Sequence, residues 1–506
     1  MVPHIRTVKT SSGARAVQIV YSNRGGKRTM EHVGSAHDDA ELELLKAAAR
    51  QRISAGQGEL QLPGLEEPAA GGPLPIRSSR MGHLLDGLSE AYRVLGFEEA
   101  TGGDEVFKQL VLARIIEPTS KLDSERVLRE AGLQPRSYRT LKRRLPVYAT
   151  EDFRASLAAA CAARAVLGPT ALVLYDVSTL YFETDQGDGF REPGFSKERR
   201  LDPQVTIGLL TDASGFPLMV NAFEGNKAET ATMLPVLRSF QAAHGITGVT
   251  VVADAGMLSR GNQIAIEQAG LSFILGARLP SVPYVIAQWH RDHPDAEAVP
   301  DGLVLTESMP AAPTDGRGHW WVYYRYAHDR GRRTLKGIAD QVAKAEKAVA
   351  GKTPVKRNRF VRLEGGTRSV NRDLEAKARA LAGWKGYVTN LPPDQADAEF
   401  IMAAYHRLFQ IERSFRMSKH DLQARPIFHH KRESIEAHLT VVFAALAVTR
   451  HIETATGMSI RKFVKTTRRY REVVIAAGDQ LITAADPLPD DLRHAINAIS
   501  IPRAAH

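Results

Sequence analysis

The strongest constraint on the fold comes from residues 170–280, where apolar runs alternate with turns and amphipathic stretches. The runs ALVLY, QVTIGLL and PLMVNAF are typical of buried strands, because they are short and rich in branched or aromatic side chains. Two further runs, VTVVA and SFILGA, each follow a helical stretch, the first ETATMLPVLRSFQAAHG and the second RGNQIAIEQAG. The segment therefore predicts a three-stranded meander, followed by helix, strand, helix and strand.

This order of elements is the one expected of a ribonuclease-H-like α/β core. Residues 281–383 break the pattern, and because the interval is too long for a loop we expect a β-rich insertion subdomain there. The strand-like run WKGYVTNLP and two helical stretches then return the chain to the core. The predicted catalytic core comprises residues 169–280 and 384–455.

The flanking regions predict smaller units. Residues 1–75 are expected to hold a β-hairpin around NRGG, a helix and a Gly/Pro-rich linker. Residues 76–168 have helical periodicity throughout and are interpreted as a helical DNA-binding domain. Residues 456–506 are predicted to form a basic, helical C-terminal tail.

The composition bounds the class of protein. Apolar residues make up 43% and charged residues 25% of the 506 residues, as in ordinary globular proteins. We find no run of about 18 uninterrupted apolar residues and no N-terminal secretory signal, so we expect a cytoplasmic protein without a membrane partner. Its 67 Lys and Arg against 57 Asp and Glu favour a polyanionic partner. The single cysteine, Cys161, is expected to be a small core residue.

Two aspartates follow strongly apolar runs. Asp176 comes after ALVLY and Asp254 after VTVVA. Open α/β folds place their sites at strand ends, although a strand-end aspartate also serves as a helix cap or turn former. A third acid, Glu412, lies in YHRLFQIERSFRMSKHDL (405–422), on the helical face that also carries Leu408 and Phe415.

Three converging carboxylates would need a cation. A carboxylate removed from water is costly unless it is paired or metal-bound, and oxygen-only ligands suit Mg²⁺ and Mn²⁺. The three acids therefore predict a two-metal site for phosphoryl transfer. The alternative for Glu412 is a salt bridge to Arg416 or Lys419 on the same helix. The pair at His429 and His430 lacks a spaced third ligand, so no zinc site is expected.

These motifs together resemble the DDE transposases of bacterial insertion sequences, in the branch with a Tyr-x2-Arg-x3-Glu-x6-Lys signature. Tyr405, Glu412 and Lys419 match that spacing, whereas the arginine position is Leu408, with Arg407 one place earlier. Arg416, on the same helical face, is the other candidate substitute. Further similar segments are YDVSTLYFE, GFSKERRLDPQVTIGLL, GFPLMVNAFEGNKAET, VVADAGMLS, GYVTNLP and ARIIEPTSKLDSERVL, so that the resemblance covers most of the chain.

The resemblance implies a ribonuclease-H-like core with a β-rich insertion between the second and third acids. Asp176, Asp254 and Glu412 would bind two Mg²⁺ ions, for which Mn²⁺ can substitute. The implied activity is cut-and-paste transposition: metal-dependent cleavage of double-stranded DNA at terminal inverted repeats, and joining to target DNA. It implies a homodimer in the DNA complex, no small-molecule substrate, and a place in the bacterial cytoplasm, on the nucleoid when bound to DNA.

Several side chains are predicted to contact DNA. Tyr405, Arg407, Arg416 and Lys419 would lie near the scissile bond. The other candidates are a basic loop, a basic helical face and an aromatic pair: Lys197, Arg199 and Arg200; Arg139, Lys142, Arg143 and Arg144; Trp320 and Trp321. The alternatives are a solvated turn, a solvated helix face, and a hairpin pair of which only one ring could stack, since adjacent strand residues face opposite ways.

Two other functions stay open. A structure-selective nuclease could use the same core and acids. A non-catalytic DNA-binding protein derived from a transposase is the third possibility, which the complete set of acids disfavours.

Overall fold

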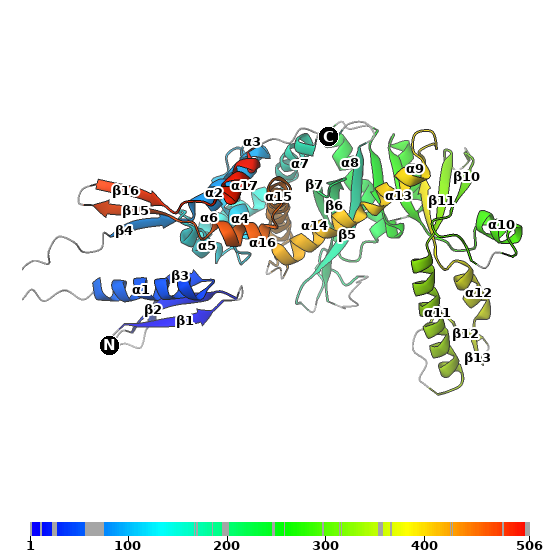
Figure 1. Ribbon diagram of the computed structural model, residues 1–506, viewed down its shortest axis with the longest axis horizontal. Coiled ribbons are helices and arrows are strands. Elements are labelled where there is room, and N and C mark those ends of the chain that lie inside the picture. The colour runs from blue at the N-terminus through cyan, green and yellow to red at the C-terminus, as the bar shows by residue number, and fades with distance from the viewer. Residues whose placement is uncertain are drawn as a thin grey trace, which may run out of the picture. The chain divides into compact units, whose positions relative to one another are not determined.

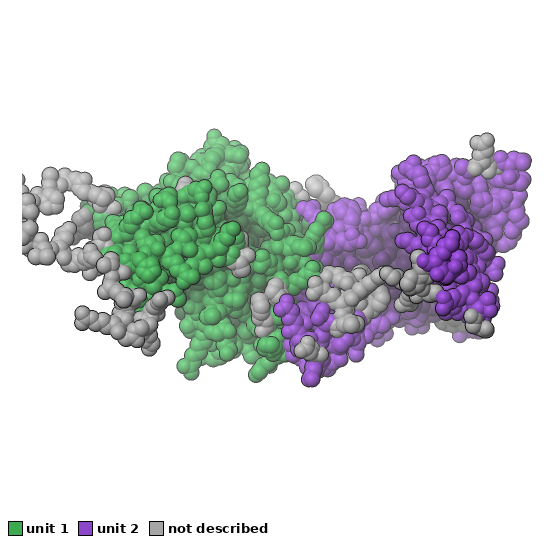
Figure 2. All heavy atoms as spheres, turned by 90° about the horizontal axis from the view of Figure 1, so that it is seen from below, with its two compact units in different colours: residues 1–160, 416–506 green, residues 161–415 purple. Residues whose placement is uncertain are grey.

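The computed structural model describes most of the chain in two compact units. The described residues are 3–10, 13–22, 28–55, 75–165, 167, 171–184, 186–194, 202–244, 248–257, 259–295, 298–312, 314, 316–352, 358–364, 367–425, 427, 429–477 and 480–500. Residues 161–415 form one unit, called unit 2. Unit 1 combines residues 1–160 with residues 416–506 (Figure 2), which means that the chain leaves this unit and returns to it.

Unit 2 is built on an eight-stranded mixed sheet with the strand order β10-β11-β14-β9-β8-β5-β6-β7. The strands are β5 (Leu172–Tyr181), β6 (Gln204–Asp212), β7 (Pro217–Glu224), β8 (Thr250–Ala253), β9 (Ser272–Ala277), β10 (Val304–Met309), β11 (Trp320–Tyr326) and β14 (Trp384–Thr389). β5, β6 and β7 form an antiparallel meander, while β8 runs parallel to β5 and β9 parallel to β8. β6 is buried along nearly all its length, as expected for a central strand covered on both faces. The predicted mixed α/β fold is confirmed.

The helices of unit 2 pack against this sheet (Figure 1). α8 (Met233–His244) contacts β6 and β7, and α9 (Arg260–Gln268) contacts β9. α13 (Ala398–His406) contacts β8, β9 and β14, and α14 (Leu408–Arg416) follows it after one residue. These helices lie where the apolar periodicity of the sequence predicts them.

The predicted insertion of residues 281–383 differs from the structure in extent. After α10 (Tyr284–Asp292), β10 and β11 extend the main sheet, because β11 pairs with β14 and β14 with β9. The separate part is smaller: α11 (His328–Val349), β12 (Val361–Glu364), β13 (Thr367–Val370) and α12 (Arg372–Ala380). Its own core is formed by Ile338, Val342, Ala345 and Phe360. The inserted part is therefore a helical pair with a short hairpin.

The N-terminal part of unit 1 is a small sheet with one helix on it. β2 (Arg15–Ser22) and β3 (Arg28–Ala36) pair antiparallel as the predicted hairpin, and β1 (His4–Lys9) adds a third strand. α1 (Asp39–Ala55) packs on β2 and β3. Val17, Ile19, Ala36, Leu42 and Ala49 form the core between sheet and helix.

Helices make up most of the rest of unit 1. They are α2 (Gly82–Val94), α3 (Phe97–Ala100), α4 (Glu105–Ile116), α5 (Ser124–Ala131), α6 (Tyr138–Tyr148), α7 (Glu151–Ala165), α15 (Arg432–Thr456), α16 (Ile460–Thr467) and α17 (Asp490–Ile499). α15 packs against α2, α4, α6 and α17, so this helix belongs with the helical domain and not with the catalytic core to which its sequence position assigned it. Cys161, on α7, is fully buried as predicted.

α15 is also the one helix, among the described residues, that is long and apolar enough to cross a membrane. Of its most apolar stretch, 94% is buried inside the structure. Core helices of globular proteins have the same property, and α15 packs against four helices of unit 1.

The C-terminal region differs from the predicted helical tail. β15 (Glu472–Ala477) and β16 (Gln480–Ala485) pair antiparallel, and β15 also pairs with β4 (Ile76–Arg80). The runs EVVIAA and QLITAA contain β-branched side chains that favour extended backbone, and β4 supplies a partner from far away in the sequence.

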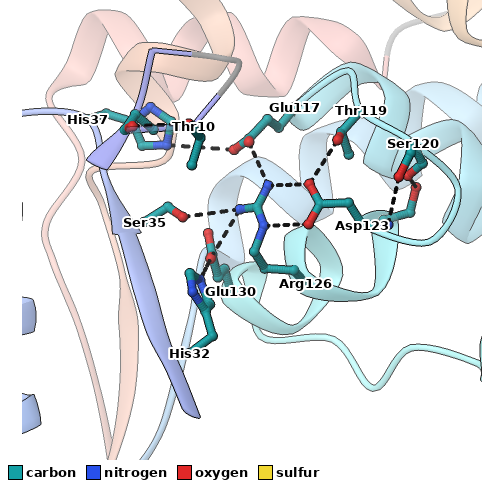
Figure 3. A network of polar contacts seen from close by, with 12 residues as sticks. Thr10, His32, Ser35, His37, Glu117, Thr119, Ser120, Asp123, Arg126 and Glu130 are labelled. Carbon is teal, nitrogen blue, oxygen red and sulfur yellow. Dashed lines mark hydrogen bonds and ion pairs between the residues drawn. The ribbon is translucent and has the colours of Figure 1, made fainter. Parts of the chain in front are cut away.

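A partly buried network of charges joins the small sheet to the helices within unit 1 (Figure 3). The guanidinium of Arg126 on α5 donates hydrogen bonds of 2.7–3.2 Å to four side chains: Glu117, Asp123, Glu130 and Ser35. Glu130 is also 2.6 Å from Nε2 of His32. Because Ser35 and His32 belong to β3, this network fixes the strand against α5.

Candidate active site

Asp176 and Asp254 extend from neighbouring strands at the same level. β5 and β8 pair in parallel as far as Tyr175 and Ala253, and the two aspartates are the next residues along each strand. Asp254 lies at the end of β8, as predicted. Asp176 differs from the prediction because β5 continues to Tyr181 through its pairing with β6, which places the aspartate within the strand. The parallel register brings both acids to one place on the sheet.

The carboxylate of Asp254 is exposed but held in position. Its Oδ1 accepts hydrogen bonds from the backbone N–H of Ala255, at 2.8 Å, and from the hydroxyl of Tyr405. The short 3₁₀ helix that follows, η2 (Ala255–Met257), is held from β9 by Arg278, whose Nε donates to the carbonyl of Ala255 at 3.0 Å. This acid therefore has a defined orientation.

Tyr405 has a different place from the predicted contact with DNA. Its side chain is only 4% exposed and packs edge-on against Tyr387, with the ring centroids 5.1 Å apart. Burial, followed by the hydrogen bond to Asp254, raises the pKa of Tyr405, and Asp176 acts in the same direction. The glycine at 276 leaves room for this hydroxyl, because a Cβ there would lie 2.7 Å from Tyr405 Oη. Tyr405 thus positions Asp254 and lies near Asp176.

Lys385, on β14, is a site residue that the sequence analysis missed. Its Nζ is 4.1 Å from the ring centroid of Tyr405. Burial lowers the pKa of Lys385, while the charges of Asp254 and Glu412 oppose that shift. The amine therefore lies in the field of the second and third acids. The available signal was a single lysine in the otherwise apolar run WKGYV.

The stretch 405–422 is not one helix. α13 ends at His406, Arg407 caps it, and α14 is followed by a π-helical turn, η4 (Met417–Asp421). Hydrogen bonds of the i to i−3 type at Arg407 and Gln410 replace the regular pattern at the first break. The apolar periodicity continues across these breaks, which is why it could not locate them.

Glu412 lies beside the buried face of α14 and is exposed, which corrects the expectation of a carboxylate on the apolar face. The buried positions are Ile401, Tyr405, Leu408, Ile411 and Ser414. The hydroxyl of Ser414 donates to the carbonyl of Gly215 at 2.7 Å, which seats α14 on the turn between β6 and β7. Within the described part of the chain, Glu412 forms no ion pair, so the alternative salt bridge is not found.

The three acids offer the oxygen ligands that a hard cation prefers, although their carboxylates do not form a compact cluster among the described residues. Asp176 and Asp254 offer carboxylate oxygens from adjacent register positions, which is the type of ligand that Mg²⁺ prefers. Lys385 and Tyr405 link the two aspartates and Glu412 to one region of unit 2. Among the described residues, however, no three Asp, Glu, His or Cys side chains are close enough to hold a metal ion together.

The two tryptophans of the predicted aromatic pair on β11 differ in burial. Trp320 is 3% exposed, its Nε1 donates to Glu267 at 3.2 Å, and its ring packs on Phe273. It is a core residue, without the exposed ring that stacking on a base requires. Trp321 is partly exposed and stacks on the imidazole of His319, with centroids 4.4 Å apart. Alternation along the strand separates the two rings.

The predicted basic contacts are distributed over several segments. Lys197, Arg199 and Arg200 lie outside the described residues. Arg407 and Arg416 are exposed, and Lys419 is half-buried in η4.

On α6, three of the four predicted basic residues face outward, and one is structural. Arg139, Lys142 and Arg143 are exposed. Arg144 instead binds Asp104, with Nε 3.1 Å from Oδ2. Asp104 is buried and also accepts hydrogen bonds from the hydroxyl of Tyr148 and from the first turn of α4.

Comparison with known proteins places the chain in a family. The family model described as a transposase DDE domain matches residues 168–448, which include all three acids. Among solved structures, a cryo-EM structure of the piggyBac transposase synaptic complex with hairpin DNA is 9% identical and covers 82% of this chain and 74% of that chain, with a TM-score of 0.37. No curated protein matches this chain. Because the family model spans more than half of the 506 residues, the chain belongs to the transposase DDE domain family.

Proposed function

We propose that this protein is the transposase of a bacterial insertion sequence, which binds terminal inverted repeats and catalyses metal-dependent cleavage and strand transfer. The observation that carries the proposal is the pairing of β5 with β8, which brings Asp176 and Asp254 to adjacent positions within the matched family region. The strand order β7-β6-β5-β8-β9, a meander followed by two parallel strands, supports a ribonuclease-H-like core.

Each residue of the site has a proposed role. Asp176, Asp254 and Glu412 would hold Mg²⁺, which would supply charge neutralisation and activation of the attacking oxygen in phosphoryl transfer. Tyr405 keeps the Asp254 carboxylate oriented through its hydrogen bond. Lys385 reduces the repulsion between Asp254 and Glu412. The exposed position of Asp254 and Glu412 leaves them accessible to a substrate as large as duplex DNA.

The remaining parts of the proposal concern partners. The excess of basic over acidic residues and the exposed side chains of Arg139, Lys142 and Arg143 support binding to DNA phosphates. Joining two element ends in one reaction requires two active sites, so we propose a homodimer in the DNA complex.

The test is cleavage of duplex DNA that carries the ends of the element, with purified protein and Mg²⁺ or Mn²⁺. Asp176→Asn, Asp254→Asn and Glu412→Gln should each lower the cleavage rate by about 1,000-fold, since the metal contributes several kcal/mol to the transition state. Glu399→Gln, which removes an exposed acid from neighbouring α13, is the matched control and should cleave normally. Unchanged cleavage by Glu412→Gln, or cleavage in EDTA, would sink the proposal.

The same preparation separates a transposase from a nuclease on the same core. With a target plasmid present, a transposase joins the cut 3′ ends to the plasmid. Cleaved ends without joined products would favour the structure-selective nuclease, and end binding without cleavage would favour a non-catalytic DNA-binding protein.

A further inference from the structure

Unit 1 contains a small cavity of about 220 Å³ between α6 and the start of α15. Lys121, from the turn before α5, lines it and is only 6% exposed. The other lining residues come mainly from α6 and from the segment that enters α15: Tyr138, Leu141, Lys142, Leu145, Pro146, His429, Lys431, Glu433 and Ser434. The lining residues belong to unit 1, whereas the three acids belong to unit 2, and the cavity has no role in the chemistry described above.

The partners of the Lys121 amine are neutral. Its Nζ is 2.5 Å from Nε2 of His429 and 3.5 Å from Nδ1 of His438. Nε2 of His438 is 3.0 Å from the carbonyl of Ala424, so this nitrogen carries the hydrogen and Nδ1 is the acceptor. Burial lowers the pKa of His429 to about 4 and that of His438 well below its ordinary value. The two rings therefore hold the amine in place without supplying a counter-charge, and burial, followed by the charge of Arg114, lowers the pKa of Lys121 itself to about 7.

A second buried cation lies close by. Arg114, on the last turn of α4, is 8% exposed, and its charge acts on Lys121 and on both imidazoles. Within the described residues, no carboxylate forms an ion pair with Lys121 or Arg114. Buried charges in proteins are normally paired, as Arg126 is in the same unit with three carboxylates. The region around the cavity therefore lacks an anion.

The rim of the cavity is suited to an anion as well. Lys142 and Lys431 are exposed at its edge, and the hydroxyls of Tyr138 and Ser434 add hydrogen-bond donors. The 25-residue helix α15 begins here without a side-chain cap, so the positive end of its dipole adds to the field. Glu433 is the one acid in the lining, and it is exposed.

The size of the cavity limits what it can hold. Sites for drug-sized ligands usually enclose about 300–1,000 Å³. At about 220 Å³ this cavity suits a small anion or one group of a larger molecule. A tetrahedral phosphate offers several acceptor oxygens, which match the amine, the two rim lysines and the hydroxyls.

We propose that this cavity binds a phosphate group through Lys121, Lys142 and Lys431, and that in the DNA complex the phosphate belongs to the DNA backbone. The second part rests on the proposed function. The phosphate completes the charge balance of Lys121 and Arg114, and its binding places α6 and the start of α15 on the DNA.

The first test uses inorganic phosphate and the full-length protein. Thermal unfolding is measured in potassium phosphate and in potassium chloride of equal ionic strength and pH. Phosphate should raise the Tm of the wild type by about 2 °C or more, because a ligand bound only by the folded state stabilises it. Lys121→Met should abolish this increase, and Lys142→Met, at the exposed rim, should reduce it without a risk to folding.

Lys46→Met is the matched control for the lost charge. Lys46 belongs to the same unit but is paired with Glu43 at 2.7 Å, so its removal should leave the phosphate effect intact. Lys121→Met replaces a buried cation by an apolar side chain of similar length and is expected to fold. No phosphate effect in the wild type, or an equal effect in Lys121→Met, would overturn the cavity as a phosphate site.

The second test identifies the source of the phosphate. Duplex binding is measured at several salt concentrations, and the slope of log Kd against log salt should fall by about 0.9 in Lys121→Met but not in Lys46→Met. A phosphate effect on Tm with an unchanged slope would overturn the assignment to the DNA backbone. Failure of the wild type to cleave element ends, with both other results as expected, would contradict the proposed function and leave this inference intact.

Discussion

The hydrogen bond between Tyr405 and Asp254 gives Tyr405 a different role from the one expected from the sequence. The resemblance to the transposase signature implied that Tyr405 contacts DNA, whereas its hydroxyl donates a hydrogen bond to Asp254 from inside the protein. Spacing along a helix cannot reveal this, because Asp254 is 151 residues away in the sequence. The same limit hid Lys385, whose partners come from β8, α13 and α14.

Tyr405→Phe tests this positioning role. The ring should keep its packing on Tyr387, and loss of the hydroxyl should slow DNA cleavage by about 10- to 100-fold, the usual effect of removing a partner of a metal-binding acid. Tyr323→Phe is the control, since that buried hydroxyl has no hydrogen-bond partner among the described residues. Equal cleavage rates for Tyr405→Phe and wild type, under metal-limiting conditions, would refute the role.

At the scale of elements, the strands were predicted best. The runs that became β5 to β9 are short, apolar and separated by clear turns, so their order along the chain and the meander of the first three followed from the sequence. Elements whose partners are distant were predicted less well. β10 and β11 were assigned to an insertion and β15 and β16 to a helical tail, because pairing with β14 and β4 leaves no local signal. Asp176 and Asp254 were proposed as site residues because they directly follow two of these apolar runs.

α6 offers a prediction at this scale, because two adjacent arginines face different surroundings. Arg143→Ala should lower the slope of log Kd against log salt concentration for duplex DNA by about 0.9. It should leave the free energy of unfolding unchanged. Arg144→Ala should leave the slope unchanged and lower the free energy of unfolding by about 1–3 kcal/mol, because Asp104 stays buried with fewer donors. Urea unfolding and duplex titrations at several salt concentrations measure the two quantities. The reverse pattern would show that Arg144 is the DNA contact.

At the scale of the whole molecule, charged contacts hold together parts of unit 1 that are separate in the sequence. Arg126→Met should lower the stability of unit 1 by about 3–5 kcal/mol, because it removes the guanidinium that buried Glu117 and half-buried Glu130 share. Arg129→Met, on the same helix, removes an exposed arginine 3.9 Å from Glu125 and should cost less than about 1 kcal/mol. Far-UV circular dichroism in urea measures both variants, and similar midpoints would contradict the importance of the network.

The stability of unit 1 should fall on acidification at pH values above those at which carboxylates become protonated. Burial first, and then Lys121 and Arg114, lower the pKa of His429 from 6.5 to about 4. Between these values the unfolded chain binds a proton that the folded chain does not, so stability falls as the pH decreases from about 6.5 to 4, by up to about 1.4 kcal/mol per pH unit. His429→Gln should show a shallower decline in urea midpoints over this range.

The measurement can separate the two units. All four tryptophans, Trp289, Trp320, Trp321 and Trp384, lie in unit 2, so fluorescence follows that unit while circular dichroism follows both. The difference between wild type and His429→Gln should therefore be seen by dichroism and be absent from the fluorescence. Parallel pH slopes for the two proteins by dichroism would contradict the assignment.

The division of unit 1 between residues 1–160 and 416–506 has a consequence for synthesis on the ribosome. Unit 2 is contiguous, so it can fold as soon as residue 415 has emerged, although it comes second in the sequence. The helices before it must wait for α15, which at about 5–20 residues per second emerges only seconds after unit 2 is finished. Until then their apolar faces are open to chaperones and proteases, and the helical part of the protein is completed last. A nascent chain that stops within unit 2 would therefore contain α6, with its proposed DNA contacts, but would lack α15, the helix against which α6 packs.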